Sequence, residues 1–209
     1  KINALPSELV LKIAYRPDRV AAQILEKEAR MLNVFKDTTW PIPIPKVTWR
    51  GVTAHGFPAL IETALEGESL EHLLSSNIDA NAAMLILGKY VATLHGLTEN
   101  TIAEFEKGRA VFPNFTTYVH HYIEEWLPLL TKALHINNAE LTEAREIIEK
   151  GLSYFTETSW PYVHADISQE NLLGKLQNQT LLLTGLCDFE NVQTGPPEYD
   201  LATIHDGIF

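Results

Sequence analysis

The feature that most limits what this chain can fold into is a pair of short strands predicted among helices. Asn171–Gly174 and Leu181–Leu186 have strand-like composition and flank a polar turn at Gln177–Gln179. The segments on either side of this pair have apolar residues at helical spacing or other helical signals instead. We therefore expect an isolated hairpin, in which the residues that enter the first strand lie beside those that leave the second.

Polar side chains stand at both open ends of this hairpin. The sequence VHADISQENLL supplies His164, Asp166 and Asn171 on the entry side, and CDFE supplies Asp188 on the exit side. Clustered carboxylate and amide oxygens suit Mg²⁺, and phosphoryl transfer also needs a carboxylate that accepts the proton of the attacking hydroxyl. Either Asp alone would be interpreted as an ordinary turn residue. Their joint spacing predicts a phosphoryl-transfer site with Asp166 as the base and His164 as a structural residue.

A small α+β unit precedes this site. Its predicted elements are a strand, a helix and two further strands, with the non-helical WPIPIP connector after the helix: Glu8–Ala14, Asp18–Phe35, Lys46–Val52 and Phe57–Ala64. From Glu66 onward, long segments with helical periodicity predict a second, mainly helical unit. The predicted organisation is an N-terminal lobe at residues 1–65 and a C-terminal lobe at residues 66–209.

Two helices of the second lobe have a clear predicted apolar face. The first face comprises Ala83, Leu87, Tyr90, Val91, Leu94 and Leu97, and the second comprises Leu141, Ala144, Ile148, Leu152 and Phe155. A third apolar segment at helical spacing runs from Phe115 to Leu130, and the YDLATI stretch near the end predicts the start of another helix.

Two charged residues of the N-terminal lobe fit a nucleotide site. Lys12 lies in the predicted first strand and Glu28 in the helix that follows, so that their side chains can meet. Either residue alone is typical of a solvated surface charge. Together with the motif in the second lobe, they predict an ion pair whose ammonium group reaches the phosphates of a nucleotide.

Composition narrows the classes of partner. The formal net charge of −11 argues against a nucleic-acid partner, because such proteins usually carry a basic face. Apolar runs such as 84–87 are far shorter than the roughly 20 residues that span a bilayer, so no membrane partner is expected. The single cysteine, Cys187, excludes an internal disulfide framework and makes the cytoplasm the expected location.

The motifs also follow one another in a familiar order. They are LVLKIA, EKEARML, PIPIPKV, ALIETALEGESL, ATLHGL, VHADISQENLL, LCDFE and GPPEYDLA. This series resembles the aminoglycoside phosphotransferase and choline kinase family over nearly the whole chain. The resemblance implies an α+β, two-lobed, protein-kinase-like fold, in which a small sheet-plus-helix lobe precedes a mainly helical lobe that carries the catalytic hairpin.

The same resemblance implies roles for the nucleotide-binding residues. Lys12 and Glu28 would position ATP or GTP as the phosphoryl donor, and the sequence does not distinguish the two nucleotides. A hinge formed by Glu62, Thr63, Ala64 and Leu65 would read the purine through its backbone.

The remaining implied roles belong to the C-terminal lobe. Asp166 would be the base, and Asn171 and Asp188 would be the Mg²⁺ ligands. Asp200 would support the catalytic loop, and Glu190 is expected to face the acceptor.

The chain departs from the family pattern at several points. Ala165 stands where Gly or Asn is common, Ser168-Gln169-Glu170 replaces a common His-Pro-Gly, and Pro196 stands where Asp is common. None of these changes removes a reacting group. The chain begins with Lys1, and we expect the glycine-rich phosphate loop and the C-terminal helices of the family to be missing from it.

Several functions compete on this architecture. Only a short segment separates Asp188 from Asp200, which leaves no room for the activation segment of a protein kinase. A nucleotide-binding pseudokinase would be expected to lose the base, the metal ligands or the lysine, and all of them are present. We expect a hydroxylated cation such as an aminoglycoside as the small-molecule acceptor, with choline, homoserine, sugars and macrolides as alternatives. The sequence leaves the oligomeric state unknown.

The expectation of a cationic acceptor rests partly on charge. Acidic residues that are predicted to flank the cleft are Glu66, Glu68, Glu124, Glu125, Glu170 and Glu190. An anionic rim of this kind would attract a polycation, although a solvated surface would have the same composition.

Overall fold

The computed structural model describes residues 8–14, 19–73, 78–98, 114–134, 136–155 and 160–208. The elements in chain order are β1 (Leu9–Ile13), α1 (Arg19–Val34), β2 (Val47–Val52), β3 (Pro58–Thr63), β4 (Glu68–Ser69), α2 (Leu70–Leu73), α3 (Asn81–His95), α4 (Phe115–Leu134), α5 (Asn138–Leu152), β5 (Tyr162–Val163), β6 (Leu172–Gln177), β7 (Thr180–Leu186), β8 (Gln193–Thr194) and α6 (Glu198–Ile208). Asp18, the expected start of the first helix, lies outside these residues.

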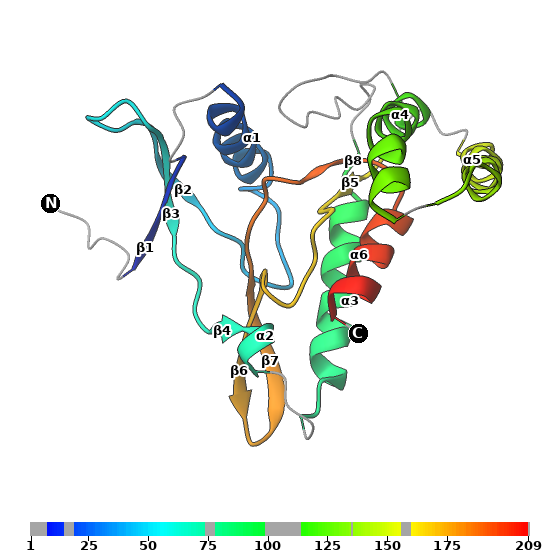
Figure 1. Ribbon diagram of the computed structural model, residues 1–209. Helices are drawn as coiled ribbons and strands as arrows, with labels where there is room; N and C mark the ends of the chain where they lie inside the picture. Colours follow the sequence, from blue (N-terminus) through cyan, green and yellow to red (C-terminus); the bar gives the residue numbers. More distant parts are fainter. Residues whose placement is uncertain are drawn as a thin grey trace, which may run out of the picture.

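A three-stranded antiparallel sheet forms the N-terminal part, with α1 packed beside it (Figure 1). The strand order is β1-β3-β2, and Lys12 lies opposite Leu60 in the ladder between β1 and β3. The strand, helix, strand, strand order that the sequence predicts is therefore observed. The WPIPIP connector is neither helix nor strand, and its Ile42 and Ile44 are buried.

The predicted hairpin is formed by β6 and β7, which pair antiparallel from Leu172 opposite Leu186 to Gln177 opposite Thr180. Its turn has only two residues, Asn178 and Gln179, both with positive φ, which suits the twist of a tight hairpin. The first strand is longer than the predicted Asn171–Gly174. Its last part is exposed, so hydrophobic patterning gives no signal there, and the backbone ladder alone extends it.

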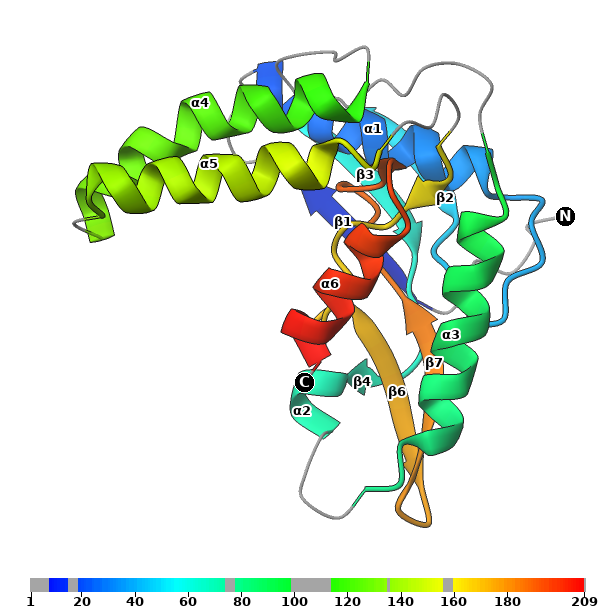
Figure 2. The same ribbon diagram turned by 90° about the vertical axis from the view of Figure 1, so that its right-hand side faces the viewer.

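The C-terminal part is mainly helical. Helix α3 packs against β7, and α4 and α5 run side by side away from the hairpin (Figure 2). Five of the six residues of the predicted α3 face are buried, namely Ala83, Leu87, Tyr90, Val91 and Leu94. On α5 only Leu152 is buried, and the other predicted face residues within the helix are half-buried.

One continuous core joins the two parts of the chain. It combines Phe35 of the N-terminal part with Ile42, with Tyr90 of α3, and with Leu172 and Phe189 around the hairpin. The ring of Phe35 meets those of Tyr162 and Phe189 edge-on. This core fixes the hairpin relative to α1, and the boundary near Leu65 between the two lobes stays a prediction.

Two short pairings were not expected from the sequence. Strand β4 adds to the hairpin through β6, and β5 pairs antiparallel with β8. These strands have two residues each, too short for any periodic signal. Within the described ranges, no helix has the length and apolar character needed to span a membrane.

Candidate active site

The open ends of the hairpin meet as predicted. Beyond the last ladder pair, the backbone N–H of Cys187 donates to the carbonyl of Asn171 at 3.0 Å. The side-chain amide of Asn171 in turn donates to the carbonyl of Asp166, also at 3.0 Å. The residue before Asp188 is thus bonded to Asn171, which is bonded to Asp166.

A buried carboxylate binds the backbone of the loop that carries Asp166. Asp200 of α6 is fully buried and accepts the backbone N–H groups of His164 at 3.0 Å and Ala165 at 2.7 Å. His95 at the end of α3 lies 2.9 Å from the same carboxylate. These bonds support the role predicted for Asp200, which stays a prediction. The contact from His95 has no signal in the sequence, because the two residues are 105 positions apart.

Ala165 has a left-handed backbone, with φ of 63°. This conformation favours Gly or Asn, the residues that are common at this position in the resembling family, and it is strained for Ala. The short hydrogen bond from its N–H to Asp200 offsets that strain.

Lys12 stands at the centre of three carboxylates. Its Nζ lies 2.5 Å from Glu28 Oε1, 3.6 Å from Glu62 Oε1 and 3.6 Å from Asp188 Oδ1. Glu28, which is fully buried, also accepts the backbone N–H of Phe189 at 3.1 Å. The predicted Lys12–Glu28 pair is present, and it is tied directly to the segment after the hairpin.

Burial and charge shift the titration of this cluster. Burial alone lowers the pKa of Lys12, but the charge and hydrogen bond of Glu28, with Glu62 and Asp188, raise it well above its usual value. Burial raises the pKa of Glu62 to about 7, opposed by Lys12 and reinforced by Glu28. The site therefore combines a firmly charged lysine with a carboxyl group that titrates near neutral pH.

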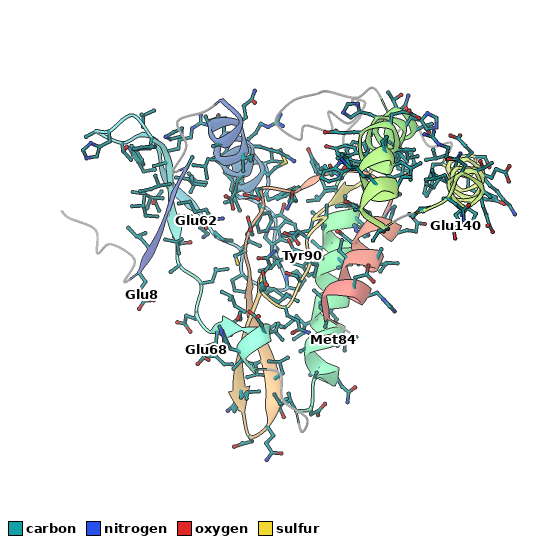
Figure 3. The ribbon with its side chains drawn as sticks, viewed as in Figure 1. Glu8, Glu62, Glu68, Met84, Tyr90 and Glu140 are labelled. Carbon is teal, nitrogen blue, oxygen red and sulfur yellow. The ribbon has the colours of Figure 1, made fainter. Side chains whose placement is uncertain are left out.

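Two backbone N–H groups of the expected hinge already have hydrogen-bond partners. Glu62 and Thr63 belong to β3, and the N–H groups of Thr63 and Ala64 already donate to Lys46 and Glu8 carbonyls at 2.9 and 3.2 Å. Glu62 lies in the part of the small sheet nearest the hairpin (Figure 3). Its side chain faces Lys12, a role that the sequence did not reveal, while Leu65 packs over Gly185 of the hairpin.

His164 is buried and packs its ring edge-on against Phe189, with centroids 4.9 Å apart. Burial lowers its pKa, although the surrounding carboxylates and the Cys187 backbone oppose that effect. Its two ring nitrogens make no hydrogen bond of normal geometry within the described chain. The structural role expected for this buried ring stays a prediction.

One residue of the site gave no signal in the sequence. The side-chain amide of Asn191 donates to Asp166 Oδ2 at 3.2 Å. Its position three residues after Asp188 carries no motif of its own. Glu190 beside it is half-buried, and burial, with the charges of Asp188 and Glu28, raises its pKa.

The residues present fit a magnesium ion. Asp188 Oδ1 is buried and makes no hydrogen bond to any described residue. The amide nitrogen of Asn171 is engaged with Asp166, so its amide oxygen is the atom that could bind a cation. No group of three or more His, Cys, Asp and Glu side chains in the described ranges is arranged to hold a metal by itself. One carboxylate and one amide suit Mg²⁺, which takes its other ligands from phosphates and water.

The proposed acidic rim is partly neutralised. Glu66 pairs with Lys175 at 2.5 Å, and Glu124 pairs with Arg145 at 2.6 Å. Both carboxylates are exposed, and these pairs lower their pKa. Fewer charges are thus available to attract a cation than the sequence suggests.

Comparisons with known proteins identify the family of the chain and its fold. A model of the phosphotransferase enzyme family matches residues 2–209. Among curated proteins, none matches the chain significantly. The chain is similar to the solved GDP and kanamycin complex of APH(2″)-IIIa, with 19% identity, a TM-score of 0.57 and coverage of 95% of this chain and 66% of that chain.

Two further solved structures are similar. A GDP complex of a mutant aminoglycoside 2′-phosphotransferase-IIIa has 19% identity, a TM-score of 0.68 and coverage of 95% of this chain and 65% of that one. The apo form of a thermostable mutant of aminoglycoside phosphotransferase APH(4)-Ia has 16% identity, a TM-score of 0.62 and coverage of 94% and 64%. The chain thus spans slightly less than two thirds of each of these three structures. The likeness confirms the α+β, protein-kinase-like fold class.

Proposed function

The chain belongs to the phosphotransferase enzyme family, and from that premise we propose that it transfers the γ-phosphoryl group of ATP or GTP to a hydroxyl of a small molecule. The observation that carries this proposal is the linkage of three predicted residues at the hairpin ends. Asn171 is bonded to the Asp166 carbonyl on one side and to Cys187, next to Asp188, on the other.

In this proposal Asp166 is the base. It accepts the proton of the acceptor hydroxyl and orients the attacking oxygen toward the γ-phosphorus. Asp200 supports that role, because its two bonds to the backbone of His164 and Ala165 fix the residues immediately before Asp166. Because the backbone just before Asp166 is already fixed, the base loses little conformational entropy when the acceptor binds.

Lys12 would bind the α- and β-phosphates, and Glu28 would hold its ammonium group in place. The Glu28 bond to the Phe189 N–H supports this, because it places the lysine at a fixed position relative to the Asp188 segment. Asn171 and Asp188 would hold Mg²⁺, which when bound neutralises charge on the phosphates. Glu62, Thr63, Ala64 and Leu65 remain the proposed hinge, and Glu190 the proposed acceptor-facing residue.

The acceptor that we propose is an aminoglycoside-like cation. The similar structures include complexes named for kanamycin and for gentamicin, at 19% identity to this chain. The likeness supports a class of acceptor. The identity is too low to single out one compound, so choline, homoserine, sugars and macrolides stay as alternatives. A cytoplasmic location also remains a prediction.

The test is a turnover assay of the purified protein with ATP and with GTP. The acceptor panel is kanamycin, gentamicin, hygromycin B, choline, homoserine, a neutral sugar and a macrolide. Asp166→Asn should lower kcat by about 10² to 10⁴, the usual scale for a general base, and leave nucleotide affinity nearly unchanged.

Near wild-type kcat in Asp166→Asn would remove the base from the mechanism. Nucleotide binding without turnover of any acceptor would support a pseudokinase instead. Turnover of a neutral acceptor alone would refute the aminoglycoside-like cation but keep the phosphotransferase.

A further inference from the structure

The side chain of Asp166 has a hydrogen-bond partner that its own loop does not supply. Asn191 Nδ2 lies 3.2 Å from Asp166 Oδ2, and both side chains are half-buried. The side chain of Asn171 binds Asp166 only at the backbone carbonyl of Asp166. Among the hydrogen bonds of the described residues, the contact from Asn191 is therefore the one that reaches the carboxylate itself.

Two features of the backbone hold Asn191 at this position. The N–H of Val192 donates to the carbonyl of Phe189 at 3.3 Å, which closes a tight turn around Asn191. Phe189 and Val192, which flank that turn, are both fully buried in the core. The amide thus extends from a turn that is anchored at both ends.

The following strand connects this turn to the catalytic loop. Gln193 of β8 pairs with Val163 of β5, and Val163 is the residue before His164. The same two-strand ladder therefore positions the chain just after Asn191 and the chain just before Asp166. This explains why two residues far apart in sequence approach within hydrogen-bonding distance.

We propose that Asn191 is a positioning residue for the base: its amide holds Asp166 Oδ2 and leaves Oδ1 to take the proton of the acceptor hydroxyl. The inference rests on the proposed function. In the transfer, the acceptor O–H bond breaks and its proton passes to Oδ1, while the acceptor oxygen bonds to phosphorus and the nucleoside diphosphate leaves with the electrons of the broken P–O bond.

The physical reason is the freedom of an aspartate about its last torsion. That torsion is broad and roughly two-fold, so an unrestrained carboxylate presents either oxygen over a range of angles. A hydrogen bond to one oxygen selects an orientation, and a bond to a charged group is stronger than one between neutral groups. The benefit should appear in the chemical step and not in nucleotide binding.

The experiment compares Asn191→Leu, Asn191→Asp and the control Asn33→Leu, which replaces an exposed residue of α1. Each is assayed with Mg·ATP and the best acceptor of the panel above, together with Mg·ATP affinity and Tm. We expect Asn191→Leu to lower kcat about 10-fold, the order that loss of one hydrogen bond to a charged group gives. Asn191→Asp should lower it further, about 100-fold, because a second carboxylate then faces Asp166. Nucleotide affinity should change less than about twofold in both.

The relative kcat values of Asn191→Leu and Asn191→Asp distinguish a positioning role from a purely structural one. Aspartate has nearly the shape of asparagine and forms the same turns, so a structural role would make Asn191→Asp the milder change. A smaller loss of kcat in Asn191→Asp than in Asn191→Leu would overturn this inference and leave the proposed function standing. Unchanged kcat in both variants, while Asp166→Asn is inactive, would do the same. If Asp166→Asn retains full turnover, or the wild type turns over no acceptor, the proposed function falls and this inference with it.

Discussion

At the scale of single residues, the main feature of the site is that three carboxylates lie within 3.6 Å of the ammonium group of one lysine. Lys12 meets a fully buried glutamate, a nearly buried glutamate and the predicted metal ligand Asp188. Under the proposed function, Asp188 would hold Mg²⁺ and Glu28 would hold the ammonium group of Lys12, which lies 3.6 Å from Asp188 and 2.5 Å from Glu28. Glu28 and Asp188 therefore have different predicted roles, although both lie near the ammonium group of Lys12.

The role of Asp188 can be tested through magnesium. We predict that Asp188→Ala and Asp188→Asn lose most of the increase in nucleotide affinity that Mg²⁺ gives to the wild type, because the bridging carboxylate is gone. The measurement is nucleotide titration with and without Mg²⁺, and Asp37→Ala at an exposed position is the control. Asp188 has a φ of 64°, where Asn is tolerated better than Ala, so the Asn variant separates lost charge from backbone strain. An unchanged magnesium effect in both variants would make Asp188 a turn residue only.

Glu62 should make stability depend on pH. Its pKa rises from 4.5 to about 7 in the folded chain, so the folded state holds a proton that the unfolded state loses in this window. Stability contributed by this group is therefore present at low pH and is lost as pH rises through about 7. We predict that Glu62→Gln has the Tm of the wild type at about pH 4, below the unfolded pKa, and a Tm a few degrees higher at about pH 8.

The control for this prediction is Glu68→Gln, which changes an exposed carboxylate of β4. Thermal unfolding is followed without nucleotide or Mg²⁺, so that only the protein's own charges act on Glu62. The same Tm difference at both pH values would show that Glu62 carries no buried charge.

At the scale of elements, three helices and one hairpin supply the contacts that hold the loop before Asp166 and the segment after the hairpin. Helix α1 supplies Glu28, α3 supplies His95 and α6 supplies Asp200, while the hairpin supplies Asn171 at its entry. Tyr90 of α3 is buried on the side that faces the hairpin (Figure 3), and burial next to Asp200 raises its pKa well above the usual value. The loop that carries Asp166 is thus held by Asp200 of α6 through its backbone and by Asn171 at the start of the hairpin.

The link between α6 and the loop gives a further prediction. Asp200→Asn should lower both Tm and kcat, because an amide cannot accept all of the hydrogen bonds that His164, Ala165 and His95 direct at the carboxylate. A buried donor left unpaired costs about 1 to 3 kcal/mol. Thermal unfolding and turnover are the measurements, and Asp206→Asn on the exposed side of the same helix is the control. Unchanged kcat in Asp200→Asn would show that the loop holds its shape without α6.

At the scale of the whole molecule, charge is the property that bears on the acceptor. The chain has 27 acidic and 16 basic residues, for a net charge of −11. Two of the six carboxylates predicted to flank the cleft form close pairs with lysine or arginine, so attraction of a cationic acceptor would depend more on the overall charge than on these six residues.

We predict that kcat/KM for a cationic acceptor falls as ionic strength rises, while kcat changes little. Added salt shortens the Debye length from about 10 Å at 0.1 M to about 3 Å at 1 M, which weakens capture but not the chemical step. Initial rates across a salt series measure both constants, and a neutral acceptor serves as the control. A salt effect of equal size on both acceptors would assign it to the nucleotide or to the protein itself.

The sequence by itself predicted the longer helices, the hairpin and a set of candidate reacting groups. Helical periodicity located α3, turn residues located the hairpin, and the spacing from Asp166 to Asp188 predicted a phosphoryl-transfer site, because each of these signals is local or depends on a single tight turn. The family inferred from the motif series is confirmed by the matching family model. The assigned roles of the individual site residues remain predictions.

Only the tertiary structure decided which side chains support those groups. Glu62 faces Lys12 because β3 pairs with β1, His95 reaches Asp200 because α3 lies next to the start of α6, and Asn191 reaches Asp166 because β8 pairs with β5. None of these pairings has a signature in the spacing of residues. Each depends on how the shared core orients segments that are distant in sequence, and that orientation is set by packing, which no local pattern encodes.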